Sequence, residues 1–293
     1  MTLRAAFDLL FLRPMKSRDA LPAIRESEVV VAGLRTPVIE AGPAQASEAV
    51  VYVHGNPGSR LDFRDLVART GDFARAIAPD MPGFGDADKP HPRDFRYRVR
   101  NMGAHLAAVL ETLGVARAHF VGHDFGGPFS IGAVLARPER AASLSFINTG
   151  ILRGYRWHKW ARIWRTPVVG ELYMLLTNES RFKAGFRRLP PEFVDQMWRH
   201  FDARTKRAVL SLYRGTNMED MSAVSAALRA LDLPSIVVWG VHDPYVPVEF
   251  ADRNKEALPR ATVHRVEKAG HWPFIDQPDE VAGILLPFLK SLI

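Results

Sequence analysis

The ten residues Ala118–Gly127, AHFVGHDFGG, decide the fold of this chain. The apolar run Ala118–Val121 is typical of a buried strand, and the residues from Gly126 onward begin a helical pattern. A strand that passes into a helix through a glycine-flanked residue is the setting of a nucleophile elbow, a tight turn that lifts the central side chain clear. Gly122 and Gly126 are small enough for this turn, and Asp124 takes the central position. A carboxylate there is ionised at neutral pH, so it needs no base to act as a nucleophile.

Strand-like and helix-like runs alternate on both sides of this stretch. Such alternation is typical of the α/β class, with a mostly parallel central sheet flanked by helices, and ligands bind at the carboxyl ends of its strands. The other expected strands are Glu28–Val31, Arg35–Ile39, Ala49–Val53, Ala74–Ala78, Ala142–Ile147, Ile236–Trp239 and Thr262–Val266. The expected helices are Asn101–Leu113, Gly126–Leu135, Val248–Ala257 and Asp279–Leu292.

Residues 151–230 interrupt the alternation. Their composition is helical, and they contain four of the six tryptophans of the chain, Trp157, Trp160, Trp164 and Trp198. We interpret this segment as a helical cap inserted over the strand ends. The expected core domain then consists of residues 1–150 and 231–293.

The composition excludes several classes of protein and site. A length of 293 residues fits one large domain with an insertion, and a hydrophobic fraction of 47% is too high for a disordered chain. The absence of cysteine excludes disulfides, zinc–thiolate sites, iron–sulfur clusters and a thiol nucleophile, and it permits the cytoplasmic location that we predict. No spacing among the ten histidines indicates a metal site, so we expect no metal.

The N-terminus carries the short apolar run Ala5–Leu12, which Asp8 interrupts. A signal peptide needs an uninterrupted apolar region and a small-residue cleavage site, so we expect an amphipathic helix here instead. No stretch approaches the ~20 apolar residues of a membrane-spanning helix, and we expect no integral membrane association.

The net charge of +7 raises the question of a nucleic-acid partner. The charge is concentrated in residues 151–230, which carry a net +8, whereas the remaining chain carries −1. Trp157, Trp160 and Trp164 fall at helical spacing among these basic residues, as in an amphipathic lid with a solvated basic face. No nucleic-acid motif accompanies them, so we expect no nucleic-acid partner. A weak preference for an anionic surface or an acidic substrate is compatible with this charge.

Two further residues complete a catalytic triad with Asp124. Asp243 follows the expected strand Ile236–Trp239, and His271 follows the last expected strand. The chain order of nucleophile, acid and histidine is that of the α/β-hydrolases. In this arrangement Asp243 fixes the tautomer of His271 and stabilises its imidazolium form.

The sequence His54-Gly55-Asn56-Pro57-Gly58 directly follows the expected strand Ala49–Val53. A turn there can aim a backbone N–H group at the nucleophile, so the N–H groups of Asn56 and Phe125 are candidates for the oxyanion hole. We assign His54 to hydrogen bonding on the substrate-binding side, and not to base catalysis.

At these residues the chain resembles the α/β-hydrolase superfamily over essentially its whole length. Its aspartate nucleophile resembles that of the branch of epoxide hydrolases and haloalkane dehalogenases. The resemblance implies, without any cofactor, attack of Asp124 on an sp³ carbon and formation of an alkyl–enzyme ester. Water activated by His271 then hydrolyses this ester.

The two activities differ in how the leaving atom is stabilised. By resemblance, a dehalogenase would hold the halide with a tryptophan directly after the nucleophile, where this chain has Phe125, and with an asparagine, which Asn56 matches. An epoxide hydrolase would protonate the ring oxygen with two cap tyrosines. The segment Leu212–Asn217, LYRGTN, resembles the one that carries such a tyrosine, which predicts Tyr213 as one acid. The second is Tyr155 or, less favoured by its position, Tyr173.

The sequence therefore favours an epoxide hydrolase that converts a small apolar epoxide to a vicinal diol, and it leaves detoxification, catabolism and biosynthesis open as its role. Trp157 and Trp272 are expected, with His54, to bind the substrate, and the protein is expected to be a monomer or a homodimer. The alternatives are a haloalkane dehalogenase with the same triad and a non-catalytic ligand receptor on a hydrolase scaffold.

Overall fold

The central sheet confirms the expected α/β class. The computed structural model describes residues 23–217 and 221–293, so the predicted helix Ala5–Leu12 lies outside the described residues. Eight strands form the sheet in the order β1-β2-β4-β3-β5-β6-β7-β8, in which β1, β2 and β4 pair antiparallel and the pairs from β4–β3 onward are parallel. The strands are β1 (Arg25–Val31), β2 (Leu34–Ala41), β3 (Glu48–Val53), β4 (Arg75–Pro79), β5 (Arg117–His123), β6 (Ala141–Ile147), β7 (Ser235–Gly240) and β8 (Thr262–Val266).

The central strands are apolar because helices cover both faces of the sheet. All six residues of β7 are buried, and so are Ala49–Val53 of β3. Parallel strands buried on both faces have continuous hydrophobic runs, because neither face meets water. This burial explains why the valine-rich runs of the sequence were sufficient to predict these strands.

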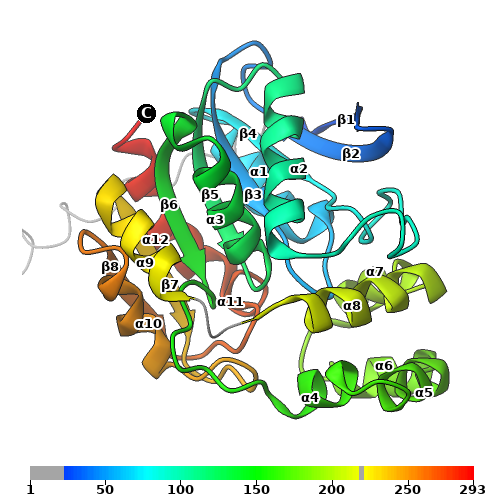
Figure 1. The fold of residues 1–293 in the computed structure, drawn as a ribbon. Helices are drawn as coiled ribbons and strands as arrows, with labels where there is room; N and C mark the ends of the chain where they lie inside the picture. Colours follow the sequence, from blue (N-terminus) through cyan, green and yellow to red (C-terminus); the bar gives the residue numbers. More distant parts are fainter. Residues whose placement is uncertain (1–22, 218–220) are drawn as a thin grey trace, which may run out of the picture.

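Helices flank the sheet in two layers (Figure 1). Helices α2 and α3 cover one face, and α1 and α12 cover the other. Helix α1 has only seven residues, too few for a clear helical period, and the sequence patterns did not predict it. The helices of the core are α1 (Arg64–Thr70), α2 (Val99–Thr112), α3 (Gly126–Ala136), α10 (Glu249–Arg253), α11 (Pro273–Asp276) and α12 (Pro278–Lys290).

The helical insertion, residues 151–230, falls between β6 and β7 (Figure 1). Its helices are α4 (Lys159–Arg165), α5 (Val169–Leu176), α6 (Glu179–Gly185), α7 (Pro191–Arg199), α8 (Ala203–Gly215) and α9 (Met221–Leu231). Helices α4 to α8 lie together at one end of the sheet, whereas α9 lies beside the sheet and Arg229 donates a hydrogen bond to the carbonyl of Glu256 at 3.0 Å. The division into a core and a cap remains a prediction. In residues 23–217 and 221–293, no helix combines the length and the apolar character needed to cross a membrane.

The turn between β5 and α3 takes a conformation that only tight packing maintains. Asp124 has a φ of 50°, in the left-handed region that side chains rarely adopt. A Cβ at Gly122 would lie 2.6 Å from the Cα of Gly127, and a Cβ at Gly126 would overlap the carbonyl oxygen of Val53. Gly122 therefore lets the turn close against the start of α3, and Gly126 lets it close against β3, which together fix the direction of the Asp124 side chain.

Replacement of Gly126 by alanine should lower the free energy of unfolding by about 3 kcal/mol, because the added methyl group displaces the β3 backbone from the elbow. Urea denaturation measures this change. The control is Gly283→Ala in α12, where nothing lies within 4 Å of the added Cβ. That variant should gain about 0.5–1 kcal/mol from helix propensity. Equal stabilities of the two variants would contradict a sterically closed elbow.

Candidate active site

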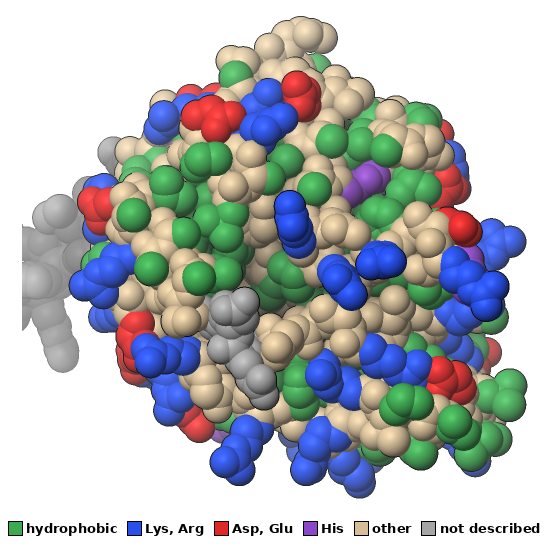
Figure 2. All heavy atoms as spheres, viewed as in Figure 1, with side chains coloured by type: hydrophobic (Ala, Val, Ile, Leu, Met, Phe, Trp, Pro, Cys, Tyr) green, Lys and Arg blue, Asp and Glu red, His purple; other side chains and the backbone are tan. Residues whose placement is uncertain are grey.

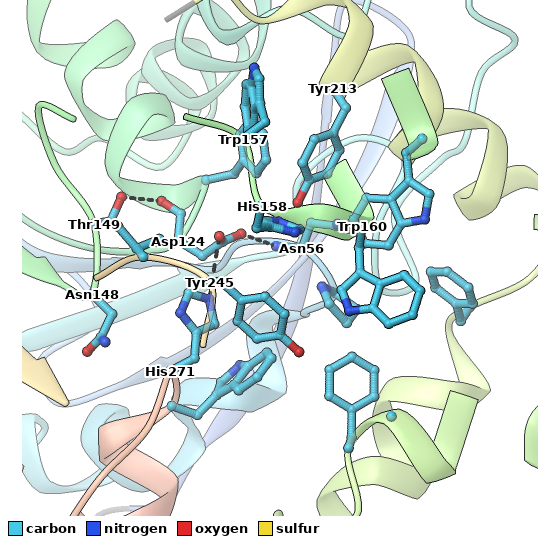
Figure 3. Close-up of a pocket in the computed structure, with 18 of the residues that line it drawn as sticks. Asn56, Asp124, Asn148, Thr149, Trp157, His158, Trp160, Tyr213, Tyr245 and His271 are labelled. Atoms are coloured by element: carbon cyan, nitrogen blue, oxygen red, sulfur yellow. Dashed lines mark hydrogen bonds and ion pairs between the residues drawn. The ribbon is translucent and has the colours of Figure 1, made fainter. Parts of the chain in front are cut away.

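Five neighbouring strands deliver polar residues to one edge of the sheet. Asn56 follows β3, Asp124 follows β5, Asn148 follows β6, Asp243 follows β7 and His271 follows β8. The carboxyl ends of parallel strands meet at the same edge, which brings these residues together although 215 positions separate Asn56 from His271. Figure 3 shows four of these side chains, Asn56, Asp124, Asn148 and His271, around one cavity.

The three predicted triad residues lie in line. The Nδ1 atom of His271 donates a hydrogen bond to Oδ2 of Asp243 at 2.7 Å, and its Nε2 atom lies 3.5 Å from Oδ2 of Asp124. Since Nδ1 carries the hydrogen bonded to Asp243, Nε2 faces Asp124 and any water that approaches it. The arrangement has the geometry that a nucleophile, a base and an orienting acid require.

Backbone and amide donors hold the carboxylate of Asp243. Asn148 donates to Oδ2 at 2.7 Å, and the backbone N–H groups of Tyr245 and Val246 donate to Oδ1 at 2.7 and 3.0 Å. Burial alone would raise the pKa of Asp243, but the charge and the hydrogen bond of His271 and these donors lower it. Asp243 therefore stays ionised and rigid beneath the histidine.

The two carboxylate oxygens of Asp124 have different partners (Figure 3). Its Oδ1 atom accepts the backbone N–H of Asn56 at 2.7 Å, and its Oδ2 atom faces His271. Of the two donors predicted for the oxyanion hole, Asn56 forms this bond in the part of the chain that the structure describes, and Phe125 does not. Burial opposes ionisation of Asp124, but the hydrogen bond and charge of His271 outweigh burial and lower its pKa. Thr149 fixes the turn by donating to the Asp124 carbonyl at 2.5 Å.

His271 is a cation held between two anions. Burial lowers its pKa, but the carboxylates of Asp243 and Asp124 outweigh burial and raise it to about 10. At neutral pH the free site therefore contains the imidazolium form and two carboxylates. Loss of either negative charge removes part of the attraction that keeps the proton on His271.

A cavity of about 390 Å³ opens in front of Asp124. Aromatic side chains form most of its wall, and the helical insertion contributes many of them. Trp157 and Trp272, both assigned to substrate binding from the sequence, lie in this wall. A cavity of this kind fits a small apolar molecule, with a few polar groups gathered at one end.

Tyr213 of α8 lies in the wall near Asp124 (Figure 3). It is 3% exposed and packs against the rings of Phe125 and Trp164, with centroids 5.0 and 4.9 Å away. Burial and the charge of Asp124 raise its pKa well above the usual value, and the Asn56 side chain opposes this shift only in part. Its hydroxyl therefore keeps its proton at neutral pH.

The prediction of Tyr155 as a second acid disagrees with the structure. Tyr155 lies in the cavity wall, but its hydroxyl donates to the carbonyl of Tyr245 at 3.0 Å and accepts the N–H of His158 at 3.3 Å. Its proton is therefore bound to the backbone and directed away from a ligand. The alternative, Tyr173, stacks against Trp160 with centroids 5.6 Å apart, on the α5 side of the cavity.

The prediction of His54 as a substrate-binding residue is also wrong. His54 is fully buried and does not belong to the cavity wall. Its Nδ1 atom donates to the carbonyl of Gly55 at 2.9 Å, and its Nε2 atom accepts the N–H of Met81 at 3.0 Å. Both ring nitrogens hold the loops after β3 and β4 together, so His54 shapes the turn that carries Asn56.

Sequence reasoning missed a second histidine in the wall. The Nδ1 atom of His158 accepts the N–H of Ala161 at 3.2 Å at the start of α4. Burial lowers the pKa of His158 to about 4, so the ring is neutral and its hydrogen is on Nε2. The ring lies beside Tyr213 and Tyr245, with centroids 6.2 and 5.2 Å away (Figure 3). No sequence signal marks this residue.

Asn148 and Thr149 were missed as well, although a signal for them existed. Both follow the expected strand Ala142–Ile147, and the strand-end rule that located Asp243 and His271 applies equally to them.

Comparisons with known proteins agree with this fold. The family model described as the alpha/beta hydrolase fold matches residues 48–278. The 2-hydroxymuconate semialdehyde hydrolase of Pseudomonas sp. strain CF600 is 27% identical over 90% of this chain and 93% of its own. A solved haloalkane dehalogenase from Bradyrhizobium elkani is 25% identical with a TM-score of 0.77, covering 92% of this chain and 100% of that one. An epoxide hydrolase from Vigna radiata has a TM-score of 0.77 at 19% identity, over 92% of this chain and 98% of that one, and shows the fold alone.

The ion pairs of His271 should make stability depend on pH. Because its pKa is raised from 6.5 to about 10 on folding, the stabilisation is fully present below pH 6.5 and is lost as pH rises through about 10. The stability advantage of the wild type over His271→Gln should therefore shrink between pH 6.5 and pH 10. Denaturation of both proteins at pH 6.5, 8 and 10 measures this difference in the free energy of unfolding. His264→Gln, on β8, is the control. A constant advantage would contradict the charged state assigned to His271.

Proposed function

The chain belongs to the alpha/beta hydrolase fold family, and we propose that it is an epoxide hydrolase that needs no cofactor. The observation that carries the proposal is the buried, protonated hydroxyl of Tyr213 beside Asp124 (Figure 3). An epoxide opens to an alkoxide, which needs a proton, and a phenol that keeps its proton can donate it at the moment the ring opens. In this proposal the helical insertion acts as the cap that supplies the acid.

The first step alkylates the enzyme. Oδ2 of Asp124 forms a bond to a ring carbon, the ring C–O bond breaks, and the ring oxygen takes the Tyr213 proton. The ester that results carries no charge, so His271 loses one of the two anions that raise its pKa. The imidazolium proton then returns to the Tyr213 phenolate through solvent, and His271 becomes the neutral base.

The second step hydrolyses the ester. Neutral His271 takes a proton from water, and the hydroxide attacks the carbonyl carbon of Asp124. Negative charge develops on Oδ1, where the Asn56 N–H already donates at 2.7 Å. Collapse of the intermediate breaks the bond between the carbonyl carbon and Oδ2 and releases the diol, which takes the remaining water proton. The Asp124 carboxylate and the imidazolium are thereby restored.

The second donor to the ring oxygen in this proposal is His158. The His158 ring belongs to the cavity wall and lies beside Tyr213, whereas the Tyr155 proton is already donated to a backbone carbonyl. A neutral imidazole donates a hydrogen bond without adding a positive charge near Asp124. His158 therefore orients and polarises the epoxide, and Tyr213 supplies the proton.

The proposed substrate is a small apolar or aromatic epoxide. The cavity holds about 390 Å³, and its aromatic walls offer stacking surfaces for a phenyl or alkyl substituent. Tyr213, His158 and Asp124 at one end of the cavity orient the epoxide ring of such a substrate. The apolar substituent of the substrate contacts the tryptophans.

A haloalkane dehalogenase is the second candidate, and the position of Asn56 favours it. The Asn56 amide lies near Tyr213 and Asp124, where an N–H group can bind a departing halide. Phe125, directly after the nucleophile, has no N–H in its side chain and supplies no second donor. A receptor without catalysis is less well supported, because the three triad residues are within hydrogen-bonding or ion-pair distance of one another.

Replacement of His271 by glutamine should trap the ester, because Asp124 can still attack while no base activates water. Mass spectrometry after incubation with styrene oxide should show the protein plus one whole epoxide, on the peptide that contains Asp124. Asp124→Ala combined with His271→Gln is the control and should show no adduct. If a bromoalkane gave an adduct that lacks bromine and styrene oxide gave none, the result would contradict the epoxide hydrolase and support the haloalkane dehalogenase.

Replacement of Tyr213 by phenylalanine should lower the rate of alkylation by about 10²–10⁴-fold, because the leaving oxygen loses its acid. His158→Phe should lower it roughly tenfold, the value of one hydrogen bond. Tyr155→Phe is the matched control and should keep nearly the wild-type rate. Rapid-mixing measurements of ester formation give all three values, and a larger loss for Tyr155→Phe than for His158→Phe would contradict the assignment.

A further inference from the structure

Helix α5 is apolar on both of its sides. Its inner side forms cavity wall through Tyr173 and Met174, and Gly170 packs against α8. Its outer side carries Leu172 and Leu175. A helix that is apolar all round is normally buried in protein or in lipid, since water disfavours every face.

The outer side forms a continuous patch, which we call the α5 stripe. It consists of Val168, Val169, Leu172, Leu175 and Leu176, of which Val168 is 77% and Leu175 is 79% exposed. These positions follow the i, i+1, i+4, i+7 and i+8 spacing that places residues on one face of a helix. They are five of the nine large hydrophobic residues exposed in the described part of the chain, and such concentration marks an interaction surface.

Basic side chains border the α5 stripe. Lys159 and Arg162 are exposed on α4, which packs against α5, and Arg181 donates to the carbonyl of Leu176 at 2.8 Å. Within residues 23–217 and 221–293, none of these three has a carboxylate within ion-pair distance. The one acid on α5, Glu171, is paired with Arg214 at 2.8 Å.

Figure 2 shows Lys and Arg side chains gathered over the half of the molecule that holds the helical insertion, with hydrophobic side chains at the corner where Figure 1 places α5. The same surface thus combines apolar contact area with positive charge. A second copy of this chain would bring like charges together across a dimer, whereas an anionic lipid surface would neutralise them.

We propose that the α5 stripe and its basic border dock the protein peripherally on an anionic lipid surface. The aliphatic side chains enter the boundary between headgroups and acyl chains, and Lys159, Arg162 and Arg181 contact lipid phosphates. Trp160, partly exposed beside the stripe and under Lys159 at 5.1 Å, lies at the depth of the headgroups. Because α5 also lines the cavity, docking places the cavity one helix away from molecules dissolved in the bilayer.

Sedimentation with sucrose-loaded vesicles of phosphatidylglycerol and phosphatidylcholine tests the proposal. The full chain should bind these vesicles at low salt and bind pure phosphatidylcholine at least tenfold less. High salt should weaken the binding because it screens the basic border. Leu172→Gln with Leu175→Gln should reduce the partition coefficient at least tenfold, and Lys159→Gln with Arg162→Gln should remove the preference for the anionic lipid.

Leu135→Gln on α3 is the matched control, because this leucine is exposed on the core away from the helical insertion. It should bind vesicles as the wild type does, and circular dichroism should confirm that every variant is folded. Absence of vesicle binding, or equal binding by the stripe variant and the control, would overturn the proposal. Self-association that the stripe variant abolishes, without vesicle binding, would overturn it in favour of a dimer.

Discussion

The alignment of one imidazolium between two carboxylates is the interaction on which the site depends. Asp124 and Asp243 stay ionised in a buried setting because His271 lies between them, and His271 stays protonated because they flank it. The proton affinities of the three groups are therefore coupled: the two carboxylates raise the pKa of His271, and His271 lowers the pKa of each carboxylate. A change in the charge of Asp124 therefore alters the proton affinity of His271 directly.

The parallel sheet brings these three side chains together. Each is placed by the end of a different parallel strand, and the order β5-β6-β7-β8 sets their spacing. Burial of the three groups beneath the aromatic wall strengthens the electrostatic interactions between them. The closed turn at Gly122 and Gly126 fixes the direction of Asp124, so the geometry is settled before a ligand enters.

The sequence was sufficient for the features that depend on chain order. The alternation of strands and helices predicted the fold, and strand ends predicted the positions of Asp124, Asp243 and His271. The sequence was insufficient where the hydrogen-bond partner of a side chain is distant in sequence. Tyr155 binds a carbonyl 90 positions away, and His54 bridges to Met81, 27 positions away. Such contacts depend on distances in the folded chain, which no local sequence pattern encodes. For the same reason, the sequence did not predict that His158 lines the cavity.

Asn148 and Thr149 stand immediately before the helical insertion, and they hold the Asp243 carboxylate and the backbone of the turn at Asp124. Asn148 binds Asp243 and the N–H of Gly240, and Thr149 binds the carbonyl of Asp124. Asn148 and Thr149, like Asp124, Asp243 and His271, lie outside residues 151–230, so the insertion itself supplies none of these contacts. Changes in the helices of the insertion would therefore alter the cavity wall, Tyr213 and His158 included, while Asp124, Asp243 and His271 keep the strand ends and contacts that position them.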